Sequence, residues 1–295
     1  MSFKDQFLAM KPGPARESLI YNEIIKRGPP KNMVPVTVPG PSGSTITYRV
    51  MPDYMMIDGI RVPMSGQTAQ KVADYFGMNL PTPKMSKQIY NAADTKIMPT
   101  PLSAGGVIGG KHYTGQEVVD RKISDSDASL AYNQLIQKEL AKQNKDSTLV
   151  AGHMKDIEQP QGDPNKLGLY GWYGKDGKPV QNSAQTPHDT SVHTEYGSGV
   201  RLVADEVTVK LPSGKTVTTT MDKLMANPNF GKVVSDTRGV SKYTMPDAKK
   251  TPVPAQEPTK TEPTMVADKG YQPPRPQSGR LTLLQRIDNF LNSIG

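Results

Sequence analysis

The residues best suited to chemistry lie in one stretch of the chain, from Leu149 to Val203. This stretch holds His153, His188 and His193, which are three of the four histidines, together with Trp172, the single tryptophan. An imidazole exchanges protons near neutral pH and is also a common metal ligand. This concentration of polar and aromatic groups between short predicted strands is typical of a functional site.

A histidine and a carboxylate lie three residues apart at His153 and Asp156. On one turn of helix they would share a side, where the carboxylate would orient the imidazole. Two further histidines, His188 and His193, follow in the same stretch. If the chain is an enzyme, we predict that His153, Asp156, His188 and His193 are its catalytic residues.

Two other chemistries remain open around the later histidines. The gap between His188 and His193 projects their rings apart on a helix or a strand, so joint metal ligation would require a loop. Ser191 or Ser198 is a candidate nucleophile with one of these histidines as base, although sequence proximity fixes no geometry. No His-Glu-x-x-His motif is present, so we predict no metal and no cofactor, with surface histidines as the simpler interpretation.

Four residues of the same stretch are predicted to bind a substrate: Trp172, Gln181, Tyr196 and Arg201. Tyr170 and Trp172 are two residues apart and would share one face of a strand. Such a pair suits stacking on a sugar ring, and it suits a wall of the core equally well.

Composition limits the function classes. The chain has 295 residues with no cysteine, which excludes disulfides, thiolate zinc sites and a cysteine nucleophile. A formal net charge of +8 favours acidic partners. The basic residues are spread along the chain without a recognition motif, so we predict no sequence-specific nucleic-acid binding. No apolar run of about 18 residues or more occurs, so no membrane span is predicted.

The hydrophobic pattern predicts a mixed α+β body with a small β-sheet and several helices. Helices are expected over 1–27, interrupted near residues 12–14, and over 65–77, 84–93 and 124–144, with a hairpin over 33–51. In the helix over 124–144, the predicted buried stripe is Leu130, Leu135, Ile136 and Leu140. Strands are expected at 57–62, 149–151, 167–173, 180, 200–203 and 207–211, and a loop at 99–115.

The chain divides into four parts by composition. We predict an N-terminal helical arm over 1–30, a central domain over 31–243, a Pro-rich linker over 244–279 and a docking helix over 280–295. An isolated helix this short is marginal in water, so it requires a partner, its own body or a membrane surface. The predicted partner-binding residues share one apolar stripe: Leu281, Leu284, Ile287, Phe290, Leu291 and Ile294.

Several short motifs resemble those of a group of bacterial and bacteriophage proteins. They stand here as Met51-Pro-Asp-Tyr54, Pro63-Met-Ser-Gly-Gln-Thr-Ala-Gln70, Leu80-Pro-Thr-Pro-Lys-Met85, Gly152-His-Met-Lys-Asp156, Tyr170-Gly-Trp-Tyr173, Gly177-Lys-Pro-Val-Gln181 and Tyr196-Gly-Ser-Gly-Val-Arg-Leu-Val203. The resemblance covers about Met33 to Asn229 and implies no established activity.

The last motif is faintly similar to one in L,D-transpeptidases, which act on peptidoglycan. The chain departs from that pattern, because it has no cysteine and because Gly197 and Ser198 replace a Ser-His pair. Tyr173 also stands where the resembling proteins have histidine. A transpeptidase mechanism is therefore excluded.

The resemblance and the arms together lead to one expectation and one alternative. We expect a bacteriophage virion structural or assembly protein, made in the host cytoplasm, whose arms bind other virion proteins or further copies of itself. The alternative is a virion-associated hydrolase acting on peptidoglycan through a His/Asp site.

Overall fold

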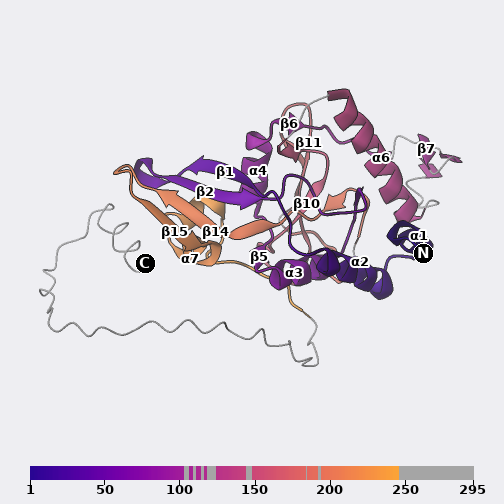
Figure 1. Cartoon of the computed structure of the whole chain (residues 1–295), viewed down its shortest axis with the longest axis horizontal. Helices are drawn as coiled ribbons and strands as arrows, with labels where there is room; N and C mark the ends of the chain where they lie inside the picture. The colour runs from indigo at the N-terminus through magenta and orange to yellow at the C-terminus, as the bar shows by residue number, and fades with distance from the viewer. Residues whose placement is uncertain are drawn as a thin grey trace, which may run out of the picture. The chain divides into compact units, whose positions relative to one another are not determined.

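The computed structural model describes residues 1–102, 106–108, 111–113, 116–117, 124–143, 148–183, 185–191 and 194–245 (Figure 1). Its mixed α+β architecture, with seven helices and several small sheets in this described part, confirms the predicted fold class. The predicted linker and docking helix, including the stripe from Leu281 to Ile294, lie outside the described residues, apart from the linker's first two positions.

The helices in chain order are α1 Phe3–Ala9, α2 Pro14–Arg27, α3 Gly66–Tyr75, α4 Pro83–Ala92, α6 Asp125–Gln143, α7 Met221–Ala226 and α8 Gly231–Val234, with a 3-10 turn η1 at Pro41–Gly43. The strands are β1 Val34–Pro39, β2 Thr45–Val50, β3 Met56–Ile57, β4 Ile60–Arg61, β5 Met78–Asn79, β6 Thr95–Lys96, β7 Gly106–Ile108, β8 Lys111–Tyr113, β9 Val150–Ala151, β10 Lys155–Glu158, β11 Gly168–Tyr173, β12 Pro179–Ser183, β13 Ser198–Gly199, β14 Val203–Lys210 and β15 Thr216–Thr220.

The N-terminal segment is helical, and it belongs to the body. Pro14 opens α2, since its fixed φ suits the first helical position, and this accounts for the break after α1. Phe3, Phe7, Ile20 and Ile24 are buried in the same core cluster as residues of α3 and β10. Residues 1–244 accordingly form one compact unit by contact.

The first sheet has the strand order β1-β2-β14-β15, and β5 also pairs with β14. The predicted hairpin over 33–51 is confirmed as β1 and β2, which pair antiparallel from Val34 opposite Val50 to Pro39 opposite Thr45. Burial alternates along β2, because every second side chain points into the core. Figure 1 shows these strands together at one side, with α7 against them.

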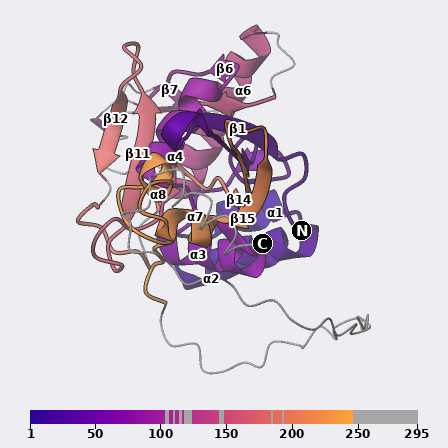
Figure 2. The ribbon, with the colours of Figure 1, turned by 90° about the vertical axis from the view of Figure 1, so that its left-hand side faces the viewer.

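The second sheet positions most of the candidate site residues. Its order is β12-β11-β10-β13, with β10 antiparallel to β11 and parallel to β13. Figure 2 shows β11 and β12 side by side. Ile157 of β10 and Leu169 of β11 are opposite one another in register and lie in the main core cluster. The alternate residues of β10, Asp156 and Glu158, carry carboxylates on the other face, which is the side of α4.

Helix α6 buries a different face from the one predicted. Ile136 is buried as expected, but Leu135 is 39% exposed. The buried face carries small and polar residues together with Tyr132 and Ile136: Ser126, Ala128, Ser129, Ala131, Tyr132, Asn133 and Ile136. The prediction was wrong because it counted apolar residues alone, whereas Ser126 and Asn133 are buried through hydrogen bonds to arginines.

Three other local predictions were also wrong. The expected strand over 57–62 is the tight β3–β4 hairpin, turned by Asp58 and Gly59 at positive φ. The expected loop over 99–115 contains the paired strands β7 and β8. His153 precedes a strand rather than lying on a helical turn with Asp156.

Within the described residues, no helix is long and apolar enough to cross a membrane.

Candidate functional site

Motif residues from distant parts of the sequence meet around a set of interior side chains, which we call the buried polar network. Its members are contributed by the segment after β2, by β4, α6 and β10, and by the segments before β10 and after β13: Asp53, Tyr54, Arg61, Asn133, His153, Asp156 and Arg201. The contacts of these side chains decide whether the network can carry out chemistry.

Asp53 and His153 form the first pair of the network. The Nε2 atom of His153 lies 3.1 Å from Oδ1 of Asp53, and the side chain of His153 is fully buried. Tyr54 stacks edge-on against the imidazole, with 5.1 Å between ring centroids. The Nδ1 atom of His153 is buried and has no hydrogen-bond partner among the described residues, so the ring is held on one nitrogen only.

Burial sets the protonation of this pair. Burial lowers the pKa of His153, and the carboxylate of Asp53 offsets this only in part, so the imidazole is neutral at neutral pH. Burial opposes ionisation of Asp53, but His153 and Arg61 outweigh it and hold the pKa of Asp53 well below its usual range. Because His153 is neutral, Arg61 is the charge that keeps Asp53 ionised, and the His153 contact is an N–H···O hydrogen bond.

Arg61 links the Asp53 carboxylate to helix α6. Its Nε donates to Oδ1 of Asp53 at 3.1 Å, and its second terminal nitrogen pairs with Oδ2. The other terminal nitrogen donates to Oδ1 of Asn133 at 2.9 Å, and the Asn133 amide donates to the Gly59 carbonyl at 3.0 Å. The guanidinium is only 2% exposed, so these bonds replace its hydration.

Arg201, predicted to bind substrate, joins three segments of the body instead. Its terminal nitrogens donate to the carbonyl oxygens of Met51 and Val150, both at 2.6 Å. The guanidinium lies 4.4 Å from the centroid of the Tyr54 ring, and its Nε lies 3.9 Å from Oδ1 of Asp156. Arg201 is fully buried, so the prediction of a substrate contact is not supported by its position.

Asp156 has a second buried carboxylate two residues further along β10. Glu158 is 0% exposed and Asp156 is 3% exposed. Oδ1 of Asp156 and both carboxylate oxygens of Glu158 lack hydrogen-bond partners among the described residues. Burial raises the pKa of both carboxyl groups, and the hydroxyl of Ser86 on α4, which lies beside the two of them, opposes this increase.

A second polar cluster lies on the opposite face of β10. Lys155 donates to Oε1 of Glu195 at 2.5 Å, and the hydroxyl of Ser198 donates to the same oxygen at 3.1 Å. The ammonium group of Lys155 lies 4.2 Å from the centroid of the Trp172 ring. Ser198, considered above as a nucleophile, is thus bonded to a glutamate rather than to a histidine.

Trp172 and Tyr170 do not share a set of neighbours. Trp172 adopts a positive φ of 53°, directly after Gly171 at 129°, so the strand alternation is broken here. Trp172 contacts Tyr132 and Tyr196, whereas Tyr170 contacts Tyr173. Tyr196 accepts a hydrogen bond from the Leu102 amide at 3.1 Å.

Two further predicted site residues, His188 and Gln181, do not belong to the buried polar network. His188 is exposed, and its carbonyl accepts a hydrogen bond from Leu167 at 3.1 Å. Gln181 lies on strand β12, opposite Gly171 of β11 in register, and is half-buried. His193 lies outside the described residues. Within the described part, no group of three or more His, Asp or Glu side chains is placed to hold a metal ion.

One surface cavity borders the buried polar network, and a second cavity lies elsewhere on the body. One of about 400 Å³ is lined by Asp53 and Tyr54 and rimmed by Arg27 and Lys31. The network therefore reaches a surface cavity at its Asp53 end, where the carboxylate side chain is 13% exposed. Access to the imidazole itself is closed, because His153 lies behind Asp53 with no exposed surface.

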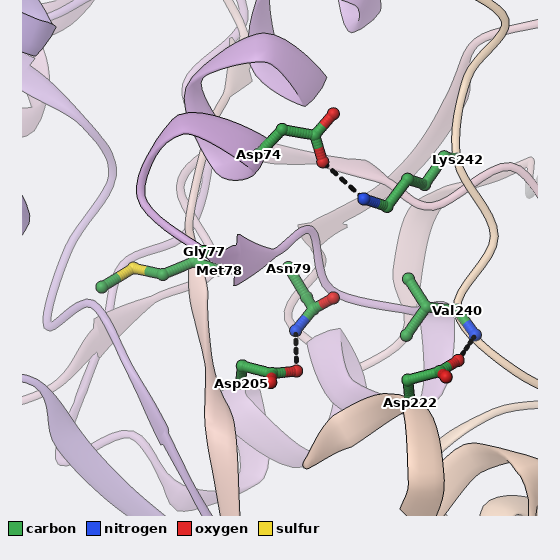
Figure 3. A pocket seen from close by; sticks show the side chains of 8 residues that line it. All are labelled: Asp74, Gly77, Met78, Asn79, Asp205, Asp222, Val240 and Lys242. Carbon is green, nitrogen blue, oxygen red and sulfur yellow. Dashed lines mark hydrogen bonds and ion pairs between the residues drawn. The ribbon is translucent and has the colours of Figure 1, made fainter. Parts of the chain in front are cut away.

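The other cavity, of about 510 Å³, lies between α3, β5, β14 and α7, and Figure 3 shows its lining. Each of its three carboxylates already has a partner from the chain: Asp74 pairs with Lys242 at 2.6 Å, Asp205 accepts from Asn79 at 3.2 Å and Asp222 accepts from the Val240 amide at 3.3 Å. We assign no ligand to this cavity, since its charged groups are satisfied internally.

Sequence reasoning missed two charged members of the buried polar network, Asp53 and Arg61, and also the buried carboxylate Glu158 beside it. Asp53 stands within the Met51-Pro-Asp-Tyr54 motif, so that motif was the signal that could have identified it. Arg61 and Glu158 carry no sequence signal, because a buried charge looks like a surface charge until the fold is known.

No protein-family model matches the chain, and the searches of curated proteins and of solved structures likewise returned no match.

Proposed function

We propose that this chain is a structural protein of a bacteriophage particle, with a rigid body over residues 1–244 and a C-terminal segment that binds neighbouring subunits. The particle type follows from the motif resemblance. The choice of a structural role depends on one observation: His153 and Arg201 of those motifs are fully buried, and they bond Asp53 and two backbone carbonyls of the body. A hydrolase must present its acid and base to a substrate within hydrogen-bond reach.

The network is suited to holding a body rigid. Arg201 bonds the backbone of the first motif at Met51 and the backbone of β9 at Val150, and Arg61 joins that motif to α6. Each guanidinium thus fixes segments far apart in the sequence. A subunit that transmits load between neighbours requires such fixed segments, and its arms supply the contacts, because a Pro-rich segment orders on binding.

Of the two arms expected from the sequence, only the C-terminal one is kept in the proposed role. The N-terminal helices contribute Phe7 and Ile20 to the core of the body, so they have little apolar surface left for a neighbour. The segment after Met245 remains the candidate arm, and its predicted contacts are made by the stripe from Leu281 to Ile294.

Deletion of residues 246–295 in the phage that encodes the chain tests the role. We expect the truncated chain to keep the thermal midpoint and circular dichroism of the full chain but to be absent from purified particles. A matched variant of full length, Leu284→Asp with Leu291→Asp, is expected to fail in the same way. Particles that incorporate both variants normally would contradict the proposal.

A hydrolase is the second candidate, because Asp53 borders the 400 Å³ cavity and is hydrogen-bonded to His153. Zymography of the full chain on peptidoglycan, with and without chelator, separates the two. We expect no clearing under either condition. Clearing that is lost in a folded His153→Gln variant but kept in His188→Ala would establish the enzyme instead.

A further inference from the structure

The polar face of β10 holds an unusual concentration of unpartnered polar atoms. Glu158 Oε1 and Oε2, Asp156 Oδ1, Ser86 Oγ and the Tyr173 hydroxyl are all buried without hydrogen-bond partners among the described residues. Buried polar groups in native proteins are almost always paired, so a cluster of this kind indicates a bound species. The chemistry of the cluster identifies that species.

The charges around Asp156 and Glu158 do not balance if both carboxyl groups are ionised. Within the described part of the chain, Arg201 is the cation that faces Asp156, at 3.9 Å, and no cation faces Glu158. The other titratable groups around the pair are tyrosines, which remain neutral because burial raises the pKa of each: Tyr54, Tyr170, Tyr173 and Tyr243. Two ionised carboxylates would leave one negative charge unbalanced in the interior.

A metal ion does not fit this balance well. The cluster offers only two carboxylates, and the Arg201 guanidinium already lies beside one of them. A calcium ion requires six to eight oxygen ligands. A single proton neutralises the surplus charge, needs no further ligands and converts one acceptor into a donor.

We propose that Asp156 and Glu158 form a buried proton-binding site, which holds one proton at neutral pH with Asp156 ionised against Arg201 and Glu158 neutral. The hydroxyl of Ser86 on α4 lies beside both carboxyl groups. In register, Glu158 is opposite Gly168, so no side chain of β11 separates it from α4. The proton thereby allows β10 to pack against α4 without an uncompensated negative charge between them.

The titration of the pair supports this assignment. Burial raises the pKa of Glu158 well above its ordinary value, and the charge of Asp156 raises it further, whereas Ser86 acts in the opposite direction. Burial also raises the pKa of Asp156, and Arg201 offsets part of that increase. Coupled carboxyl groups lose their protons in steps that belong to the pair, and the first step leaves one proton in place.

The raised pKa of Glu158 makes the stability of the folded chain depend on pH. A carboxyl whose pKa is raised in the folded state keeps a proton that the unfolded chain has released. Stability therefore falls as the pH rises above the unfolded value of about 4.3, until the pair itself ionises. For one proton, the folding equilibrium constant falls about tenfold for each pH unit in that window.

Denaturant unfolding of the full chain and of Glu158→Gln, between about pH 5 and pH 9, tests the site. The ratio of the two folding constants cancels titrations that both proteins share, including that of His153. We expect the ratio of wild type to Glu158→Gln to fall about tenfold per pH unit at the acid end of this range. The matched control Glu206→Gln, at an exposed position of β14, is expected to give a level ratio. A level ratio for Glu158→Gln would overturn the proposal.

Infrared spectroscopy gives a second readout that does not require the variant to fold. The wild-type chain at neutral pH is expected to show the carbonyl band of a neutral carboxylic acid. This band should disappear on alkaline titration, in the pH range where the loss of stability levels off. Absence of the band at neutral pH would show that both carboxyls are ionised and would refute the site.

Discussion

Removal of the charge of Asp53 is the most direct perturbation of the buried polar network. In Asp53→Asn the side chain keeps its size and one accepting oxygen, but the Arg61 guanidinium loses the carboxylate that balances it. Arg61 is 2% exposed and His153 is fully buried, so water cannot replace the lost partner. Breaking a buried ion pair by removal of one partner costs about 3–5 kcal/mol.

The expected cost lies at the lower end of this range, at about 3 kcal/mol, because Asn still accepts one hydrogen bond and Asn133 still accepts from Arg61. With a urea slope of about 2 kcal/mol per molar, the unfolding midpoint should fall by about 1.5 M. Urea unfolding followed by circular dichroism measures this shift directly.

The control is a second aspartate that pairs with an arginine at the surface. Asp58 lies 2.8 Å from Arg27, and the side chains are 48% and 42% exposed. Asp58→Asn should therefore cost less than about 1 kcal/mol. Asn also tolerates the positive φ of 50° at this position, so backbone strain does not enter the comparison.

Acid pH provides a second comparison. The pKa of Asp53 is lowered in the folded chain, so its contribution to stability is complete above the unfolded pKa and is lost as the pH falls below it. The difference between wild type and Asp53→Asn should shrink below about pH 4. The reasoning is refuted if Asp53→Asn loses no more stability than Asp58→Asn at neutral pH.

Three further substitutions test other steps by the same urea assay. A methyl group at Gly199 would lie 2.5 Å from the Tyr54 ring, so Gly199→Ala should cost about 1–3 kcal/mol, and wild-type stability would contradict that packing. Ser65 accepts from the Thr68 amide at 3.2 Å as the N-cap of α3, so Ser65→Ala should cost about 1 kcal/mol, and no loss would argue against the cap. His188 is exposed, so His188→Ala should stay within about 0.5 kcal/mol of wild type, and a larger loss would place it in a structural contact.

Elements with local signals were predictable from the sequence. Ser65 caps α3 and Thr82 caps α4, and in each case the side-chain oxygen satisfies an amide of the first turn. The hairpin of β1 and β2 followed from alternating apolar residues around a Pro- and Gly-rich turn. These signals act over a few residues, so no knowledge of the tertiary fold was needed.

The buried face of α6 was not predictable from its own residues. Ser126 accepts from Arg16 at 3.2 Å, and Asn133 accepts from Arg61 at 2.9 Å, so polar side chains turn inward and Leu135 turns outward. The arginines come from segments many residues earlier in the chain. Hydrophobic periodicity carries no information on such pairings, because it treats every polar residue as exposed.

The pairing of His153 and Asp156 differs from the one that their spacing in the sequence indicated. His153 and Asp156 do belong to one buried network, but the imidazole bonds Asp53 rather than Asp156. Asp156 faces α4, together with Glu158. His153 lies in the bend before β10 and not on a helical turn, so helical spacing does not bring its ring beside Asp156.

Several motif residues of this chain hold the body together, and this affects how the motif resemblance is interpreted. A motif is usually taken as a sign of chemistry, yet Asp53, His153 and Arg201 have bonds that join segments of the body to each other. Loss of any one of these side chains would leave a buried charge or donor without a partner. These residues are therefore required by the fold, whether or not a reaction takes place. Resemblance at such positions therefore argues for a shared body, and function has to be sought at exposed surfaces and in the segment after Met245.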